Sequence, residues 1–351
     1  MINTLILKIT GDKEDEEKIE QAAQELRRGG LVAFPTETVY GLGGNGLDPH
    51  VVDKIYKAKG RPSDNPMILH ISSREEIDPL VSEIPPIAEK IMSAFWPGPL
   101  TFIFNKSSIV PEKVTGGLNT VAIRMPSHPL AKKLIEKSGM PIAAPSANLS
   151  GKPSPTKAKH VIQDLMGRVE IILKEKQSTI GLESTVLDIT SPIPVILRPG
   201  GITYQQIKEL IGKVEIDKGI MEDRKKDFKP KAPGMKYTHY APNAPMTIIQ
   251  GPRWKVIDKI NEMADDYTAQ GKHIGILAVQ ENLEYYSKGT IMSAGSRDKP
   301  ESIAANLFDL LRQFDEEKVD VILAEGIEGQ GIEMAIINRM NKAAGHKIIY
   351  V

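Results

Sequence analysis

The chain has 351 residues, 45 basic and 45 acidic side chains, and no cysteine. This length suggests two domains, and a hydrophobic fraction of 40% allows packed cores, which argues against global disorder. A formal charge of zero argues against a protein held to nucleic acid mainly by its net charge. Without cysteine, disulfides, thiolate metal sites and cysteine nucleophiles are excluded.

No apolar run approaches the roughly 20 residues that a membrane-spanning helix requires. The first residues also lack the positive charge and the longer apolar stretch that begin a signal peptide. We therefore expect a cytoplasmic protein.

Strand and helix patterns alternate through the first 212 residues. Helices are predicted at 17–28, 51–57, 84–95 and 130–137, and strands at 31–34, 67–71, 100–104, 121–124 and 141–144. A further apolar strand is predicted from the segment after Ser184 to Arg198. This alternation predicts an α/β domain in which helices cover a sheet.

The pattern changes after residue 212. Residues 213–245 are rich in charge, proline and glycine, as linkers are, although they include Tyr237, His239 and Tyr240. Strands are then predicted at 246–250, 273–279 and 319–324, and helices at 256–270, 303–314 and 334–344. The domains are therefore 1–212, a linker at 213–245, and a smaller Rossmann-like α/β domain at 246–351. In that last domain, the glycine-rich segment 326–331 is predicted to be a turn.

Gly41–Gly46 matches the dinucleotide fingerprint G-x-G-x-x-G between a predicted strand and a predicted helix. The fingerprint also requires an acidic residue about 20 positions later, where this chain has a basic loop. A nicotinamide or flavin role is therefore the weaker interpretation. The Walker A, H-E-x-x-H and G-x-S-x-G patterns are absent.

The basic loop carries Lys57, Lys59 and Arg61, and Asn65 leads from it into a predicted strand. A solvated surface loop is the ordinary interpretation of such a run. However, cations this close together repel one another unless an anion joins them, and phosphates match both their charge and their geometry. The loop therefore indicates a polyphosphate site.

Two further loops are rich in small polar side chains. One contains Ser146, Asn148 and Ser154 after a short buried strand, and the other contains Glu183 and Ser184. Hydroxyls and exposed amides bind phosphate and ribose, although such residues also form ordinary turns and helix caps. Arg124 ends a buried strand, where a charge without a partner would be costly.

Taken in order, these segments resemble the long form of the L-threonylcarbamoyladenylate synthases. The motifs are PTETVYGLG (35–43), KGRP with NP (59–66), WPGPLT (96–101), VAIRMP (121–126), PSANLSG (145–151), ESTV (183–186), RPG (198–200) and PGMKYTHYAP (233–242). The resemblance implies a YrdC-like domain with a twisted mixed sheet and flanking helices, a linker that folds over the active site, and a C-terminal domain.

The family makes an adenylate from L-threonine, bicarbonate or CO2, and ATP, and releases pyrophosphate. The resemblance implies that Lys59 and Arg61 act on the phosphates during catalysis. The implied ATP-binding residues are Lys59, Arg61, Asn65, Thr120, Ser146, Asn148, Ser154, Arg198, Tyr237 and Tyr240. The implied threonine-binding residues are Thr38, His70, Arg124, Ala144 and Ser184. Mg²⁺ is expected to accompany ATP, with phosphate and water as its main ligands and no dedicated protein metal site.

The resemblance also implies the partners. The product would pass to the tRNA threonylcarbamoyl transferase complex for N6-threonylcarbamoyladenosine synthesis, with weak RNA contact at most and no membrane contact. The alternative is a YrdC-like RNA-binding module without adenylate-forming activity. Its basic residues would grip a phosphate backbone, and its binding would fall steeply with salt.

Overall fold

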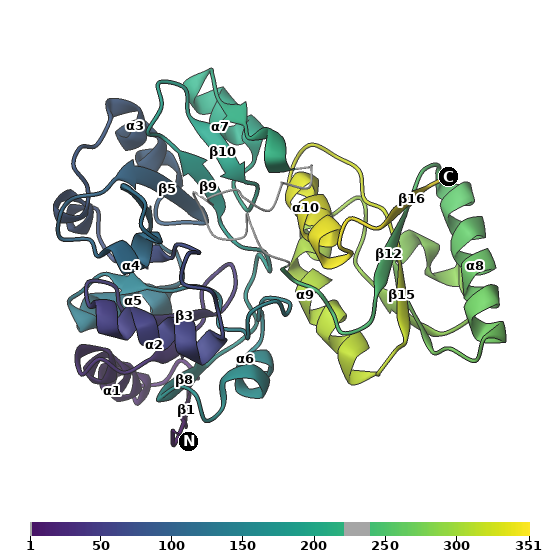
Figure 1. Cartoon of the computed structure of the whole chain (residues 1–351), viewed down its shortest axis with the longest axis horizontal. Helices are drawn as coiled ribbons and strands as arrows, with labels where there is room; N and C mark the ends of the chain where they lie inside the picture. Colours follow the sequence, from purple (N-terminus) through teal and green to yellow (C-terminus); the bar gives the residue numbers. More distant parts are fainter. Residues whose placement is uncertain (1, 221–238) are drawn as a thin grey trace. The chain divides into compact units, whose positions relative to one another are not determined.

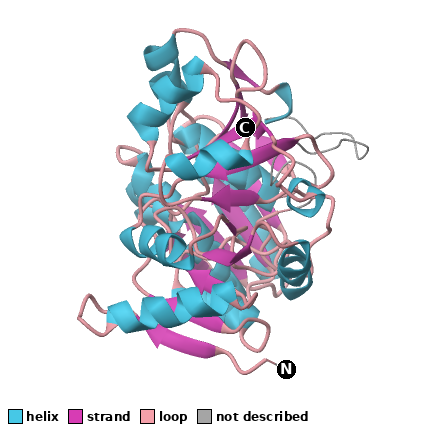
Figure 2. Ribbon diagram, turned by 90° about the vertical axis from the view of Figure 1, so that its left-hand side faces the viewer, coloured by secondary structure: helices cyan, strands magenta, loops and turns pink. Residues whose placement is uncertain are grey.

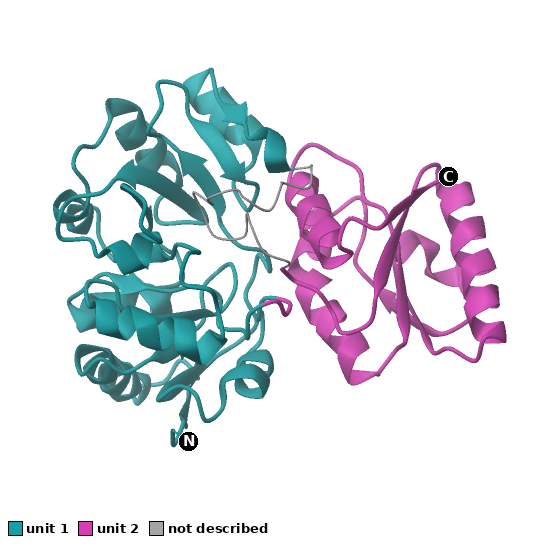
Figure 3. Cartoon of the chain, in the orientation of Figure 1, with its two compact units in different colours: residues 1–150, 154–237 teal, residues 151–153, 238–351 magenta. Residues whose placement is uncertain are grey.

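The structure is a computed structural model that describes residues 2–220 and 239–351. The chain divides into two compact units (Figure 3), each described by itself below. The first comprises Met1–Ser150 and Ser154–Tyr237, and the second comprises Gly151–Pro153 and Thr238–Val351. Tyr237, one of the predicted ATP-binding residues, lies outside the described residues.

One large sheet organises the described part of the first unit (Figure 1). Its strands are β1 (Leu5–Lys8), β2 (Val32–Phe34), β3 (Gly41–Asn45), β4 (Ile68–His70), β5 (Leu100–Asn105), β6 (Thr120–Arg124), β7 (Ile142–Ala143), β8 (Ile171–Lys174), β9 (Thr185–Asp188), β10 (Val195–Arg198) and β11 (Glu215–Ile216). They follow the order β1-β8-β2-β3-β7-β4-β6-β5-β9-β10-β11. Strands β4 and β6 are parallel, whereas β5 and β6 are antiparallel, so the predicted mixed sheet is confirmed.

Helices cover this sheet and bury its apolar side chains. They are α1 (Asp15–Arg27), α2 (Pro49–Lys59), α3 (Pro86–Phe95), α4 (Glu112–Thr115), α5 (Pro129–Ser138), α6 (Ala158–Leu165) and α7 (Tyr204–Ile211), with short 3₁₀ turns at Glu75–Leu80 and Lys218–Ile220. One core joins Leu26 of α1 and Leu134 of α5 to Phe34 of β2. A larger core includes Ile55 of α2 and Phe102 of β5. Gly60, with a φ of 61°, ends α2 immediately after Lys59.

The structure departs from the sequence interpretation of the first unit at two segments, and it adds the unpredicted elements β8, β11, α4, α6 and α7. The turn that a dinucleotide fingerprint requires, already the weaker interpretation of Gly41–Gly46, is absent there, because Gly41–Asn45 form strand β3, which pairs with β2 and β7. Close packing explains a glycine here, because a Cβ on Gly43 would lie 2.7 Å from the Phe34 ring and 2.8 Å from the Ile142 side chain. The apolar run that ends at Arg198 is two antiparallel strands, β9 and β10, rather than one.

The second unit is a smaller α/β fold. Its elements are β12 (Met246–Gln250), α8 (Arg253–Ala269), β13 (Ile274–Ala278), a 3₁₀ turn (Gln280–Tyr285), β14 (Thr290–Ser293), α9 (Pro300–Glu316), β15 (Val321–Glu325), α10 (Glu333–Ala343) and β16 (Ile348–Tyr350). All of its strand pairs are parallel, in the order β14-β13-β15-β12-β16. Figure 1 shows α8 on one side of these strands and α9 and α10 on the other, and Figure 2 marks helices in cyan and strands in magenta. The predicted Rossmann-like domain is confirmed, and sequence reasoning missed only its two edge strands, β14 and β16.

Two features of the second unit concern residues singled out from the sequence. The Tyr240 ring packs against Phe308 at 5.0 Å, and the Arg339 guanidinium lies 5.7 Å from its centroid. The Pro153 carbonyl accepts hydrogen bonds from Arg312 Nε (3.1 Å) and Nη2 (2.6 Å). Arg312 belongs to α9, so this helix holds Pro153, which lies in the same unit. None of the described helices is long and apolar enough to cross a bilayer.

Candidate active site

The strand register gathers several of the predicted residues at one end of the large sheet. His70 ends β4 and pairs in register with Arg124, which ends β6, and Arg124 pairs with Thr101 of β5. The Thr101 hydroxyl lies 2.8 Å from that of Ser184, just before β9. Arg198, at the end of β10, donates from Nη2 to the Ser184 hydroxyl (3.1 Å) and from Nε to the Ser184 carbonyl (3.0 Å). The two loops therefore converge with the strand ends.

Arg124 is the centre of this cluster and is only 4% exposed. Its Nε donates to the Gly98 carbonyl (3.2 Å), its Nη1 donates to the Thr38 hydroxyl (2.9 Å), and its Nη2 lies 2.7 Å from Glu37 Oε1. Burial by itself would raise the pKa of Glu37, but the Arg124 charge and the Ser127 N–H hold it below its usual value. The site thus holds a charged, buried ion pair.

His70 and Ala144 lie beside this pair in different ways. Burial, together with the nearby Arg124 charge, lowers the pKa of His70 to about 3, so the imidazole is neutral at pH 7. Its Nδ1 lies 3.2 Å from the Ile68 carbonyl. The Ala144 N–H donates to that same carbonyl at 3.0 Å. A neutral His70 can take part in a hydrogen bond to a ligand but adds no charge.

Lys59 ties the basic loop to the hydroxyl-rich loop. Its ammonium is buried and donates to the carbonyls of Ser146 and Asn148 (2.6 Å for the latter). Arg61 Nη2 donates to the carbonyls of Asn65 (3.1 Å) and Pro66 (2.7 Å). Carbonyl oxygens therefore already hold both cations, and their proximity does not in itself require a phosphate.

The hydroxyl-rich loop is ordered by its own side chains. The Ser146 hydroxyl donates to Asn148 Oδ1 (2.6 Å), and Asn148 Nδ2 donates to the Leu149 carbonyl (2.9 Å). The Ser154 hydroxyl donates to Glu183 Oε1 at 2.6 Å. Glu183 immediately precedes Ser184 in the sequence. Glu183 therefore joins the hydroxyl-rich loop to the residues around Arg124.

Thr120 and Asn65 lie farther along the strands. Thr120 begins β6, four residues before Arg124, which corresponds to about 13 Å of extended chain. Thr120 pairs in register with Asn105 of β5, and Asn65 lies three residues before the start of β4, the other strand that pairs with β6. The predicted ATP-binding residues thus fall into a group at the start of β6 and a group near its end.

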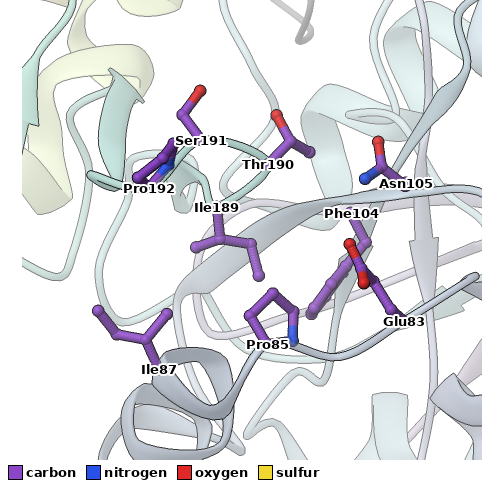
Figure 4. Close-up of a pocket in the computed structure, with 9 residues that line it drawn as sticks. All are labelled: Glu83, Pro85, Ile87, Phe104, Asn105, Ile189, Thr190, Ser191 and Pro192. Atoms are coloured by element: carbon purple, nitrogen blue, oxygen red, sulfur yellow. The ribbon is translucent and has the colours of Figure 1, made fainter.

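A well-formed hollow of about 290 Å³ lies elsewhere in the first unit (Figure 4). It is lined by Glu83, Pro85, Ile87, Phe104, Asn105, Ile189, Thr190, Ser191 and Pro192. Phe104 and Ile189 lie at the ends of β5 and β9, whereas Thr101 and Ser184 lie at their beginnings. None of the predicted site residues that the structure describes lines the hollow, and its described lining includes no Lys or Arg, so we do not assign the chemistry to it.

Glu37 and Thr101 are not among the predicted site residues, although they lie inside the PTETVYGLG and WPGPLT motifs. The only signal in the sequence was a glutamate amid small, apolar and hydroxyl residues. The sequence does not show that this glutamate is buried, because its partner Arg124 belongs to β6, a strand distant in the chain. Within residues 2–220 and 239–351, no group of three or more His, Asp or Glu side chains is arranged to hold a metal ion.

Comparison with known proteins covers nearly the whole chain. A family model described as "Telomere recombination" matches residues 24–200, and one described as "Threonylcarbamoyl-AMP synthase, C-terminal domain" matches residues 202–345. The threonylcarbamoyl-AMP synthase of Pyrococcus abyssi is 49% identical over 348 residues, which are 99% of this chain and 100% of the relative. That of Bacillus subtilis is 50% identical over 336 residues, 95% of each chain. The crystal structure of P. abyssi Sua5 complexed with L-threonine superposes with a TM-score of 0.92 at 48% identity and covers 99% of both chains.

Proposed function

Because the chain belongs to the threonylcarbamoyl-AMP synthase family, we propose that it condenses L-threonine, bicarbonate or CO2, and ATP into L-threonylcarbamoyladenylate and pyrophosphate. The observation that carries the proposal is the buried cluster around Arg124, where Thr38, Ser184 and His70 meet at the strand ends. A guanidinium held in a fixed orientation among hydroxyls suits a small, polar amino acid.

We assign threonine to this cluster. Arg124 takes the substrate carboxylate, because its planar group binds carboxylates with two parallel hydrogen bonds. Thr38 and Ser184 offer hydroxyls, His70 offers a neutral imidazole, and the chain at Ala144 offers backbone groups. The relative solved with L-threonine supports this assignment by its similarity.

We assign ATP to the loops that Lys59 joins. Arg61 and Asn65 hold phosphates, with Thr120 beside them. Ser146, Asn148, Ser154 and Arg198 line the remainder, and Lys59 keeps the two loops in register. Mg²⁺ arrives with the nucleotide as MgATP, where it offsets the charge of the triphosphate. The predicted contacts from Tyr237 and Tyr240 and the predicted folding of 213–245 over the site remain part of this proposal.

The reaction needs no protein nucleophile. The ammonium of threonine first loses a proton to solvent, and the free amine then takes up CO2 to give a carbamate and a second proton, which solvent also accepts. A carbamate oxygen then attacks the α-phosphorus of ATP. The bond between this phosphorus and the oxygen that bridges to the β-phosphate breaks, which releases pyrophosphate. The protein supplies orientation and electrostatic stabilisation, which are the main sources of catalysis when two anions must meet.

The direct test is an assay with radiolabelled bicarbonate, in which pyrophosphate release must depend on threonine. Arg61→Ala is expected to weaken ATP binding and to leave threonine binding unchanged, and Arg124→Ala is expected to do the reverse. Pyrophosphate release without threonine, or no release at all, would overturn the proposed function. If both variants bind both ligands normally, the assignment of residues is wrong.

We further propose that the product is passed to the tRNA-modifying transferase in the cytoplasm, with at most weak RNA contact. An RNA-binding module without synthase activity makes the opposite prediction. Its binding to RNA would not depend on threonine and would fall steeply with salt concentration.

A further inference from the structure

Glu37 is a buried carboxylate whose Oε1 has partners and whose Oε2 has no hydrogen-bond partner among the described residues. The residue is 6% exposed and lies between β2 and β3. Its Oε1 accepts a hydrogen bond from the Ser127 N–H at 3.0 Å and lies 2.7 Å from Arg124 Nη2. Its Oε2 is buried and has no hydrogen-bond partner among the described residues. Buried carboxylate oxygens are nearly always hydrogen-bonded, so Oε2 indicates a donor that the described residues do not provide.

The charges around Glu37 favour a cationic donor. His128 faces it, and the His128 Nε2 lies 3.4 Å from Glu175 Oε2. Burial lowers the pKa of His128, against the opposing charges of Glu175 and Glu37, so the imidazole is neutral at pH 7. Near this neutral imidazole, the described side chains thus include two carboxylates, those of Glu37 and of the partly exposed Glu175. A second carboxylate near Glu37 makes a cationic donor more favourable there than an additional anion.

We propose that Glu37 binds the α-ammonium group of threonine through Oε2 while the neighbouring Arg124 binds the α-carboxylate. The inference rests on the proposed function. A free amino acid carries its ammonium and carboxylate on adjacent positions of one carbon atom. The Glu37–Arg124 pair places a negative and a positive side chain next to each other. One threonine zwitterion can therefore bind Glu37 with its ammonium and Arg124 with its carboxylate.

The environment of Glu37 favours recognition over proton transfer. Arg124 and the Ser127 N–H keep the pKa of Glu37 below its usual value, so the group is a weak base at neutral pH. Its contribution is therefore a charge-assisted hydrogen bond that selects amino acids over carboxylic acids of the same shape.

The test compares L-threonine with 3-hydroxybutyrate, which has the carboxylate, hydroxyl and methyl of threonine but no amine. Calorimetric titration of the full-length wild type should give at least tenfold tighter binding of threonine. In Glu37→Gln, which keeps the shape but not the charge, threonine should bind at least tenfold more weakly than to the wild type. Binding of 3-hydroxybutyrate should change less than twofold. The matched control is Glu136→Gln on the exposed face of α5, which should leave both affinities unchanged.

Several outcomes overturn the inference. If Glu37→Gln weakens both ligands by the same factor, Glu37 acts only through the orientation of Arg124. If it changes neither, Glu37 does not touch the substrate. If Glu37→Gln fails to fold, the wild type alone can still overturn the inference. A preference of less than twofold for threonine over 3-hydroxybutyrate would exclude recognition of the amine. A wild type that binds no threonine overturns the proposed function as well, so the two failures are distinguishable.

Discussion

The buried Glu37–Arg124 pair should couple strongly in stability, and this can be measured by replacing each partner. Arg124→Met removes the guanidinium and keeps much of its volume, and Glu37→Gln removes the opposing charge. In the first variant Glu37 keeps the Ser127 N–H but loses its cation. In the second, Arg124 keeps its hydrogen bonds to Gly98 and Thr38.

The magnitude follows from burial. Both side chains are less than a tenth exposed, and breaking such a pair from one side leaves a charge in a poorly solvated place, which costs about 3–5 kcal/mol. The double variant leaves neither charge, so its loss of stability should be well below the sum of the two single losses. We expect a coupling energy of about 2–3 kcal/mol.

Urea unfolding can follow the first unit specifically. The chain has two tryptophans, of which Trp96 is buried in the first unit and Trp254 is 55% exposed in the second. In a Trp254→Phe background the fluorescence change therefore reports the first unit alone. The control cycle replaces the exposed pair Lys113–Asp53 with Met and Asn, where the coupling should be below about 1 kcal/mol.

Additive losses at Glu37 and Arg124, within about 0.5 kcal/mol, would refute the reasoning. They would mean that solvent or another group compensates each charge on its own. A coupling equal to that of the exposed control pair would lead to the same conclusion.

Three further predictions concern other parts of the chain. The pKa of His70 is lowered to about 3, so on acidification the unfolded chain binds a proton at this residue before the folded chain does. The free energy of unfolding should therefore fall below pH 6.5 by about 1.4 kcal/mol per pH unit. In urea titrations at a series of pH values, His70→Asn should flatten that slope. Lys59→Met leaves the carbonyls of Ser146 and Asn148 without their buried ammonium donor and should raise the KM for ATP at least tenfold. The control Lys57→Met, on the exposed side of α2, should leave this KM unchanged. Equal KM values for the two variants would refute the positioning role of Lys59. Deletion of residues 213–351 should reduce the rate of threonine-dependent pyrophosphate release, because the linker is predicted to close the site, and an unchanged rate would contradict that role.

Local patterns in the sequence determined the elements that carry the site. Apolar periodicity predicted most of the described helices and about half of the described strands to within a few residues, since burial of one face leaves a regular pattern in the sequence. The basic loop after α2 and the charge at the end of β6 were visible because Lys59, Arg61 and Arg124 stand at the boundaries of these elements. The family resemblance then depended on the order of the motifs along the chain.

Only the tertiary structure decided what these residues contact. Gly41–Gly46 matches a nucleotide-binding turn in sequence, but pairing with β2 and β7 makes most of it a strand, since hydrogen bonds to distant segments override local preference. Glu37 is an unremarkable glutamate in the sequence, and it becomes a buried partner only because β6 brings Arg124 to it from 87 positions away. Charge and burial at a site depend on which strands lie side by side, and a single sequence does not state that register.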